Sequence, residues 1–272
     1  MAPAETDQIQ EDESVPYEKM LALAYATADG FRSLAVGVDS GRADDVGGAL
    51  CWYSSSYVPL FNGAGLFEER LFNPNTLAAI DAYFAARQRP YSLITLDGLV
   101  QDASARLSRL NCPELEANPA MWLDGPPKAW ESPPQDLWVS HVQTASELAS
   151  FRAVLCAVFV ISRAEADLIL SDKVLGVPYM RHYLGWLGGE PVGTTSLVLT
   201  GSVAGIWNVG TLPEYRRQGI AAEIVRHALA DAATLGYANS MLLSSNLGLR
   251  LYERLGYRTI STVRMFAPSL YR

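Results

Sequence analysis

Apolar residues change from strand-like to helix-like spacing within residues 206–222, and this stretch organises the interpretation of the chain. It starts apolar and β-prone, turns at Leu212-Pro213-Glu214, and becomes helical from Gly219 onward. Gly236 suits the left-handed position that ends a helix. The pattern therefore predicts a strand, a tight turn and a helix whose apolar face consists of Ile220, Ala221, Ile224, Val225, Ala228, Leu229, Ala232 and Leu235.

Two arginines and a glycine occupy the turn, and this combination suits a phosphate group. Arg216 and Arg217 supply positive charge, while Gly219 lacks a Cβ and lets an anion approach the backbone. The first amides of a helix have no partner inside the helix, and the helix dipole favours an anion there. A solvated helix start with ordinary surface arginines is the alternative interpretation of so short a motif.

The rest of the second half alternates strands and helices. Thr144 with Glu147 forms a capping box, Ser162 can cap the next helix, and residues 187–190 read as a hairpin turn. Gly256 closes a short helix near the C-terminus. We predict strands at 136–142, 179–186, 192–199, 240–243 and 257–266, and helices after residue 144, at 163–170 and at 247–255.

The first half has a similar mixed order. The pattern predicts helices at 17–27, from Asn75 or Thr76 to Pro90, and at 99–110, with strands at 31–38, 48–58, 59–67 and 91–96. Residues 124–134 contain four prolines in eleven residues and read as a linker. The interleaving of strands and helices indicates an α/β chain of two domains.

Charge and composition exclude several classes of protein. The net charge is −8, and the N-terminal tail supplies five of the negative charges through Glu5, Asp7, Glu11, Asp12 and Glu13. Such a tail is expected to be disordered, and no basic stripe for nucleic acid follows it. An acidic N-terminus does not fit a secretory signal, and the longest apolar run, residues 153–161, is about half of a membrane span.

The cysteines and histidines do not show metal-ligand spacing. An odd number of cysteines without an export signal indicates reduced, buried thiols and a cytoplasmic protein. We therefore expect no metal site. The residues concerned are Cys51, Cys112, Cys156, His141, His182 and His227. From the charge and the apolar runs, we also expect no membrane partner and no nucleic-acid partner.

Two motifs at a suitable separation resemble the GNAT superfamily of N-acetyltransferases. Arg216, Gly219 and Ala221 fill the acyl-CoA signature of Arg or Gln, two residues, Gly, one residue, then Gly or Ala. Further on, Tyr252 precedes the pair Gly256-Tyr257, as a tyrosine commonly does in the family. The resemblance covers roughly residues 136 to 272 and implies acetyl-CoA as the co-substrate.

The resemblance also implies roles for individual residues. Tyr252 would lie by the CoA sulfur and protonate the leaving thiolate as general acid, although a core aromatic would show the same pattern. Asn246 would lie near the thiol end of CoA. The backbone of Val209, Gly210 and Thr211 would bind the pantetheine arm, and the pyrophosphate would lie on the loop formed by Arg216, Arg217, Gln218, Gly219, Ile220, Ala221 and Ala222.

One departure from the family concerns the base. Many relatives place a glutamate on the fourth strand, but residues 204–210 contain no acidic residue, and Asn208 is the polar side chain there. The sequence therefore assigns no base, and a water chain or a group from the first domain could take this role.

The predicted fold class is α/β with two domains, the second having a central mixed, largely antiparallel sheet flanked by helices. We predict a disordered tail at 1–15, a first domain at 16–123, a linker at 124–134 and the GNAT domain at 135–272. The first domain contains no acyl-CoA signature, so it is a degenerate GNAT copy or another small α/β domain. We expect residues 135–272 to bind acetyl-CoA on their own and the acceptor to bind between the domains.

The sequence predicts an acetyl-CoA-dependent N-acetyltransferase acting on a primary amine of a small molecule. Two alternatives stay open. The missing strand carboxylate suggests an acyl-CoA-binding regulatory module without turnover, and transfer to a protein lysine or N-terminus would change the partner. A monomer and a homodimer fit the sequence equally well.

Overall fold

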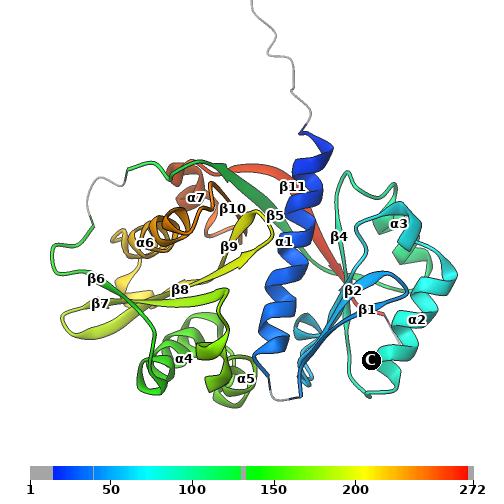
Figure 1. Cartoon of the computed structure of the whole chain (residues 1–272), viewed down its shortest axis with the longest axis horizontal. Coiled ribbons are helices and arrows are strands. Elements are labelled where there is room, and N and C mark those ends of the chain that lie inside the picture. Colours follow the sequence, from blue (N-terminus) through cyan, green and yellow to red (C-terminus); the bar gives the residue numbers. More distant parts are fainter. Residues whose placement is uncertain (1–14, 39, 130–132, 269–272) are drawn as a thin grey trace, which may run out of the picture.

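The computed structural model describes residues 15–38, 40–129 and 133–268, which form one sheet of 11 strands flanked by helices (Figure 1). The predicted mixed α/β fold with a largely antiparallel sheet is confirmed. The predicted disordered tail lies outside the described residues except for Val15, and so do residues 130–132 of the predicted linker.

The second half contains the elements that the sequence predicts, with small shifts at their ends. The capping box of Thr144 and Glu147 is present, Ser162 caps its helix, and Gly256 is left-handed with φ of 101°. The strands are β6 (Trp138–His141), β7 (Met180–Leu187), β8 (Glu190–Thr200), β9 (Val203–Thr211), β10 (Asn239–Leu243) and β11 (Arg258–Phe266). The helices are α4 (Ala145–Phe159), α5 (Arg163–Ile169), α6 (Ile220–Thr234) and α7 (Leu249–Leu255), with 3-10 turns at Asp172–Gly176 and Pro213–Tyr215.

The first half departs more from the prediction. Its strands are β1 (Arg42–Val46), β2 (Ala49–Tyr53), β3 (Gly63–Gly65), β4 (Ser92–Leu96) and β5 (Glu114–Asp124). Its helices are α1 (Tyr17–Val36), α2 (Pro74–Ala85) and α3 (Ala103–Arg109), with 3-10 turns at Pro59–Phe61 and Glu69–Leu71. The strand predicted at 31–38 is wrong, because α1 continues through it. Buried residues at helical spacing explain this, namely Ala24, Ala28, Phe31 and Ala35.

The two halves repeat the same order of strand pairings. In the second half, β7, β8 and β9 pair antiparallel in sequence, and β10 then pairs parallel to β9 with α6 between them. In the first half, β1, β2 and β3 pair antiparallel, and β4 pairs parallel to β3 with α2 between them. A short helix and a long strand end each half, α3 with β5 and α7 with β11.

The last strand of each half lies within the sheet of the other half. The strand order is β1-β2-β3-β4-β11-β5-β10-β9-β8-β7-β6. Thus β5 pairs antiparallel with β10 and β11, while β11 pairs antiparallel with β4 and β5. The described part of the predicted linker is also bonded to the second half, since the amides of Gly125 and Lys128 donate to the carbonyls of Ala238 and Leu255.

Helix α1 lies across the junction of the two halves (Figure 1). Its Phe31 stacks on Trp52 of β2 at 5.1 Å and contacts Trp207 of β9 edge-on at 5.3 Å. Gly30 allows this approach, because a Cβ there would lie 2.1 Å from a ring carbon of Trp207. The first half is therefore packed directly against β9.

We now expect residues 135–272 produced alone to lack a cooperative unfolding transition and to bind no acetyl-CoA. This reverses the expectation from sequence, because the fragment lacks β5 and leaves the facing edges of β10 and β11 unpaired. Thermal denaturation followed by circular dichroism tests this, with residues 16–272 as the control that keeps the full sheet. A fragment that melts cooperatively and binds acetyl-CoA would show that β5 is dispensable.

Candidate functional site

Strands β9 and β10 separate at their carboxyl ends. Their parallel pairing runs from Val203 with Asn239 to Ile206 with Leu242, whereas β9 continues to Thr211. The side of β9 that faces β10 is thus unpaired over residues 207–211. Trp207, Asn208 and Val209 are half-buried in this section. An extended ligand could form backbone hydrogen bonds with β9 here, as an added strand does.

A β-bulge lies in the same section. Thr194 of β8 pairs with Gly210 and Ser196 pairs with Trp207, so two residues of β9 lie opposite one residue of β8. Asn208 has φ of 52°, in the left-handed region that asparagine tolerates better than most residues. The Thr194 hydroxyl donates to the Asn208 carbonyl at 2.8 Å and fixes the bulge.

The loop before α6 leaves a run of backbone amides unbonded. None of the six successive amides from Arg217 to Ala222 donates to another described residue, and no side chain caps α6. Arg217 and Gly219 are both left-handed, with φ of 63° and 83°. Alternating left-handed residues turn successive amides toward one point, which makes an anion-binding concavity at the positive end of a helix.

The side chains of this loop are exposed and basic. The Arg216 Nε donates to the Thr211 carbonyl at 3.1 Å, which ties the loop to the end of β9. Arg217 and Gln218 are exposed beside it. The unpaired section of β9 and the open amides before α6 are therefore adjacent parts of one surface.

The corresponding helix of the first half, α2, has a closed N-terminus. The Asn73 side chain accepts hydrogen bonds from the amides of Asn75 and Thr76, both at 3.0 Å. Glu68 and Glu69 occupy the preceding loop, where they form ion pairs with Arg70 and Arg106. The two amides are already bonded to the Asn73 side chain, so this helix start does not suit a phosphate.

Comparison with known proteins agrees with this geometry. Residues 148–257 match the model of the acetyltransferase (GNAT) family. Residues 148–257 of the second half therefore form a GNAT domain. The match supports acyl-CoA-dependent acetyl transfer as the general class of activity, and no curated protein matches the chain.

Three solved structures share the fold over both halves. A GCN5-related N-acetyltransferase from Kribbella flavida is 21% identical with a TM-score of 0.70, covering 92% of this chain and 96% of that chain. Another from Sphaerobacter thermophilus is 13% identical with a TM-score of 0.59, covering 80% and 76%. A functionally unknown conserved protein from Staphylococcus epidermidis ATCC 12228 is also 13% identical, with a TM-score of 0.56 and coverage of 84% and 94%. At these identities the likeness concerns the fold alone.

Tyr252 lies on α7 and is 6% exposed. It belongs to the buried cluster that contains Ile220 and Ala222 of α6, and its ring contacts Tyr257 edge-on at 6.0 Å. Burial raises the pKa of the Tyr252 hydroxyl well above its usual range, so the phenol stays protonated at neutral pH. A proton donor must be protonated, but a tyrosine that only packs in the core is protonated as well, so the raised pKa fits both roles.

Asn246 lies in the loop between β10 and α7 and is exposed. The loop starts where β10 leaves β9, because Leu243 still pairs with Ala120 of β5 but not with β9. Asn246 thus follows, by three residues, the end of β10 at the opening between the two strands.

Sequence reasoning missed a buried polar chain next to the bulge. The Asn208 Nδ2 donates to the Ser196 Oγ at 3.0 Å, and that hydroxyl also bonds to the His182 Nδ1 at 2.8 Å. Burial, with a smaller effect of the nearby His141, lowers the pKa of His182 to about 4. These residues come from three neighbouring strands, so no linear motif links them.

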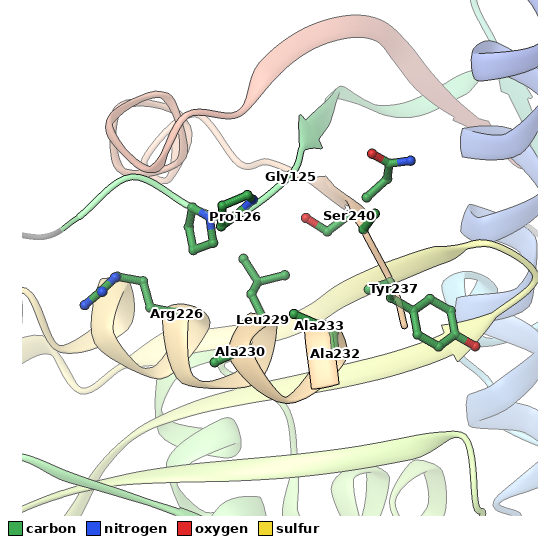
Figure 2. Close-up of a pocket in the computed structure, with 13 residues that line it drawn as sticks. Gly125, Pro126, Arg226, Leu229, Ala230, Ala232, Ala233, Tyr237 and Ser240 are labelled. Atoms are coloured by element: carbon green, nitrogen blue, oxygen red, sulfur yellow. The ribbon is translucent and has the colours of Figure 1, made fainter. Parts of the chain in front are cut away.

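Two cavities lie away from this opening. One, of about 470 Å³, lies between α6 and residues 125–127, at the amino ends of β9 and β10 (Figure 2). Five of its thirteen lining residues are alanines, and Arg226 lies at one end and Tyr237 at the other. A second, of about 460 Å³, lies between α2 and α3 of the first half.

Two other kinds of feature are absent from the described ranges. No helix there combines the length and apolarity needed to cross a membrane. Nor do three or more histidine, cysteine or acidic side chains gather there as metal ligands would.

Proposed function

We propose that the chain is an acetyl-CoA-dependent N-acetyltransferase that acts on a primary amine of a small molecule. The observation that carries the proposal is the run of six unbonded amides at the start of α6, beside the unpaired section of β9. A CoA molecule has the matching chemistry, a pyrophosphate for the amides and an extended pantetheine arm for the strand. The GNAT family match supports acyl-CoA-dependent acetyl transfer as the general class of activity.

The proposal assigns a role to each residue that the GNAT resemblance implies. Arg216 through Ala222 would hold the pyrophosphate, and the backbone of Val209, Gly210 and Thr211 would hold the pantetheine arm. Asn246 would lie near the thiol end. Tyr252 would protonate the CoA thiolate when the amine displaces it, since burial keeps its hydroxyl protonated.

We also propose that the first half is a GNAT copy without a cofactor site. The repeated strand pairings support a common topology, and the capped start of α2 explains why no second phosphate site is expected. The first half would then serve the acceptor. Its helix α1 packs against β9 at Trp207, and the Ser56 hydroxyl donates to Glu165 of α5.

Turnover with a panel of acceptors tests the proposed activity. Release of CoA from acetyl-CoA would be followed with tyramine, putrescine and a lysine peptide, and the products identified by mass spectrometry. We expect acetylation of at least one free amine. Acetylation of the peptide alone would favour a protein acceptor, and acetyl-CoA binding without turnover on any amine would favour a regulatory module, so either result contradicts the proposal.

A further inference from the structure

The bulge in β9 changes the direction in which Asn208 points. In a regular strand, neighbouring side chains lie on opposite faces, so Asn208 would lie opposite to Trp207, on the α6 face with Ile206. The extra residue and the left-handed φ of Asn208 bring its side chain to Ser196, which pairs directly with Trp207. Bulges of this kind often re-aim a side chain beside an active site.

The chain of hydrogen bonds fixes the role of each group. The Ser196 hydroxyl accepts from the Asn208 amide nitrogen, so its own hydrogen is available for the His182 Nδ1. His182 then carries its proton on Nε2, in the neutral form. These two hydrogen bonds thus hold the Asn208 amide in one orientation, with Nδ2 directed inward.

The hydrogen-bonded side chains of His182 and Ser196 are buried where apolar side chains would otherwise pack. His182 is 2% exposed, contacts Phe151 of α4 edge-on at 5.2 Å, and lies next to the apolar cluster beneath α4 and α5. Its Nε2 has no hydrogen-bond partner among the described residues. An unsatisfied buried N–H destabilises the fold, so packing alone does not account for a histidine here.

The Asn208 oxygen, by contrast, is unused. Its Nδ2 is bonded inward, no described residue donates to Oδ1, and the residue is half-buried in the unpaired section of β9. An amide oxygen accepts hydrogen bonds from N–H groups.

On the basis of the proposed function, we propose that Asn208 Oδ1 accepts a hydrogen bond from the acceptor amine, and that Ser196 and His182 are positioning residues for Asn208. The amine nitrogen is then oriented by a neutral group, on a strand that has no carboxylate in residues 204–210. Holding the nucleophile in one geometry lowers the barrier to its attack.

Steady-state kinetics of Ser196→Ala and Asn208→Ala test the proposed role of Asn208. The probe is the best amine of the panel above. Ser196→Ala should raise KM for the amine roughly tenfold, the worth of one hydrogen bond, and leave the Kd of acetyl-CoA unchanged. Asn208→Ala should lose more in kcat/KM, and the double variant should match Asn208→Ala alone, because Ser196 acts through Asn208. Thr195→Val is the control, since it removes a neighbouring buried hydroxyl that bonds to the Thr194 carbonyl.

A spectroscopic readout separates positioning from general loss of structure. The chain has three histidines, so ¹⁵N-histidine spectra can be assigned by single substitutions. His182 should show the neutral Nε2–H form at pH 7, with its Nδ1 shift changed by Ser196→Ala and not by Thr195→Val. A wild-type chain that turns over amines while Ser196→Ala leaves KM unchanged, or alters the Kd of acetyl-CoA instead, would overturn the inference. Failure of the wild type to bind acetyl-CoA would refute the proposed function itself.

Discussion

Replacing Gly219 by valine should weaken acetyl-CoA binding more than about 100-fold while the protein stays folded. Gly219 has φ of 83°, which a β-branched residue adopts only under strain, and it lies within the run of open amides. Losing two or more hydrogen bonds to charged phosphate oxygens, each worth roughly 1.5–3 kcal/mol, gives an effect of this size. Isothermal titration calorimetry measures it.

Gly236→Val is the matched control for this substitution. Gly236 also has a positive φ, 90°, and a Cβ there would meet open space at the far end of α6. Both substitutions should cost similar stability, on the order of 1–3 kcal/mol, but only the first should remove binding. If the two variants bound acetyl-CoA equally well, the loop before α6 would not be the pyrophosphate site.

Replacing Tyr252 by phenylalanine should lower kcat roughly 10- to 10⁴-fold without changing the Kd of acetyl-CoA. The substitution removes one hydroxyl, which has no hydrogen-bond partner among the described residues, so little packing is lost. Because burial raises the pKa of Tyr252, the phenol should remain a proton donor throughout the neutral range. Steady-state rates with saturating acetyl-CoA measure the effect.

Tyr257→Phe is the control for a lost buried hydroxyl. Tyr257 is 2% exposed and shares a hydrogen bond of 2.7 Å with Ser240, so its hydroxyl has a structural partner. We expect this variant to lose stability and to keep its turnover. Equal turnover by Tyr252→Phe and the parent would make Tyr252 a packing residue.

Local signals in the sequence predicted most of the second half. Thr144 with Glu147, Ser162 and Gly256 act on their own helix ends, so their effects do not depend on distant residues. The loop before α6 is similar, because its open amides follow from Gly219 and the start of the helix.

Strand β5 was not predicted, and its environment explains why. Its first residues are exposed and its last are buried, so no single period runs through it. Pro119 interrupts it, which argues against a central strand. Proline is tolerated here because its carbonyl, and hence its missing N–H, face the β10 side just past the last β10 pair, Leu243 with Ala120; the carbonyl accepts from the Ser244 amide.

The buried hydrogen-bond series beside the site could not be predicted from the sequence either. His182, Ser196 and Asn208 lie on three strands, and their contact depends on register and on a bulge that only the paired sheet defines. Sequence spacing gives the residues of one loop, whereas a site built across strands requires the fold.

Titration of acetyl-CoA into the full chain tests the central claim most directly. The open start of α6 and the capped start of α2 predict one site per chain. Calorimetry should therefore give a stoichiometry of one for the parent and no measurable binding for Gly219→Val. Two equivalent sites, or no binding by the parent, would contradict the account.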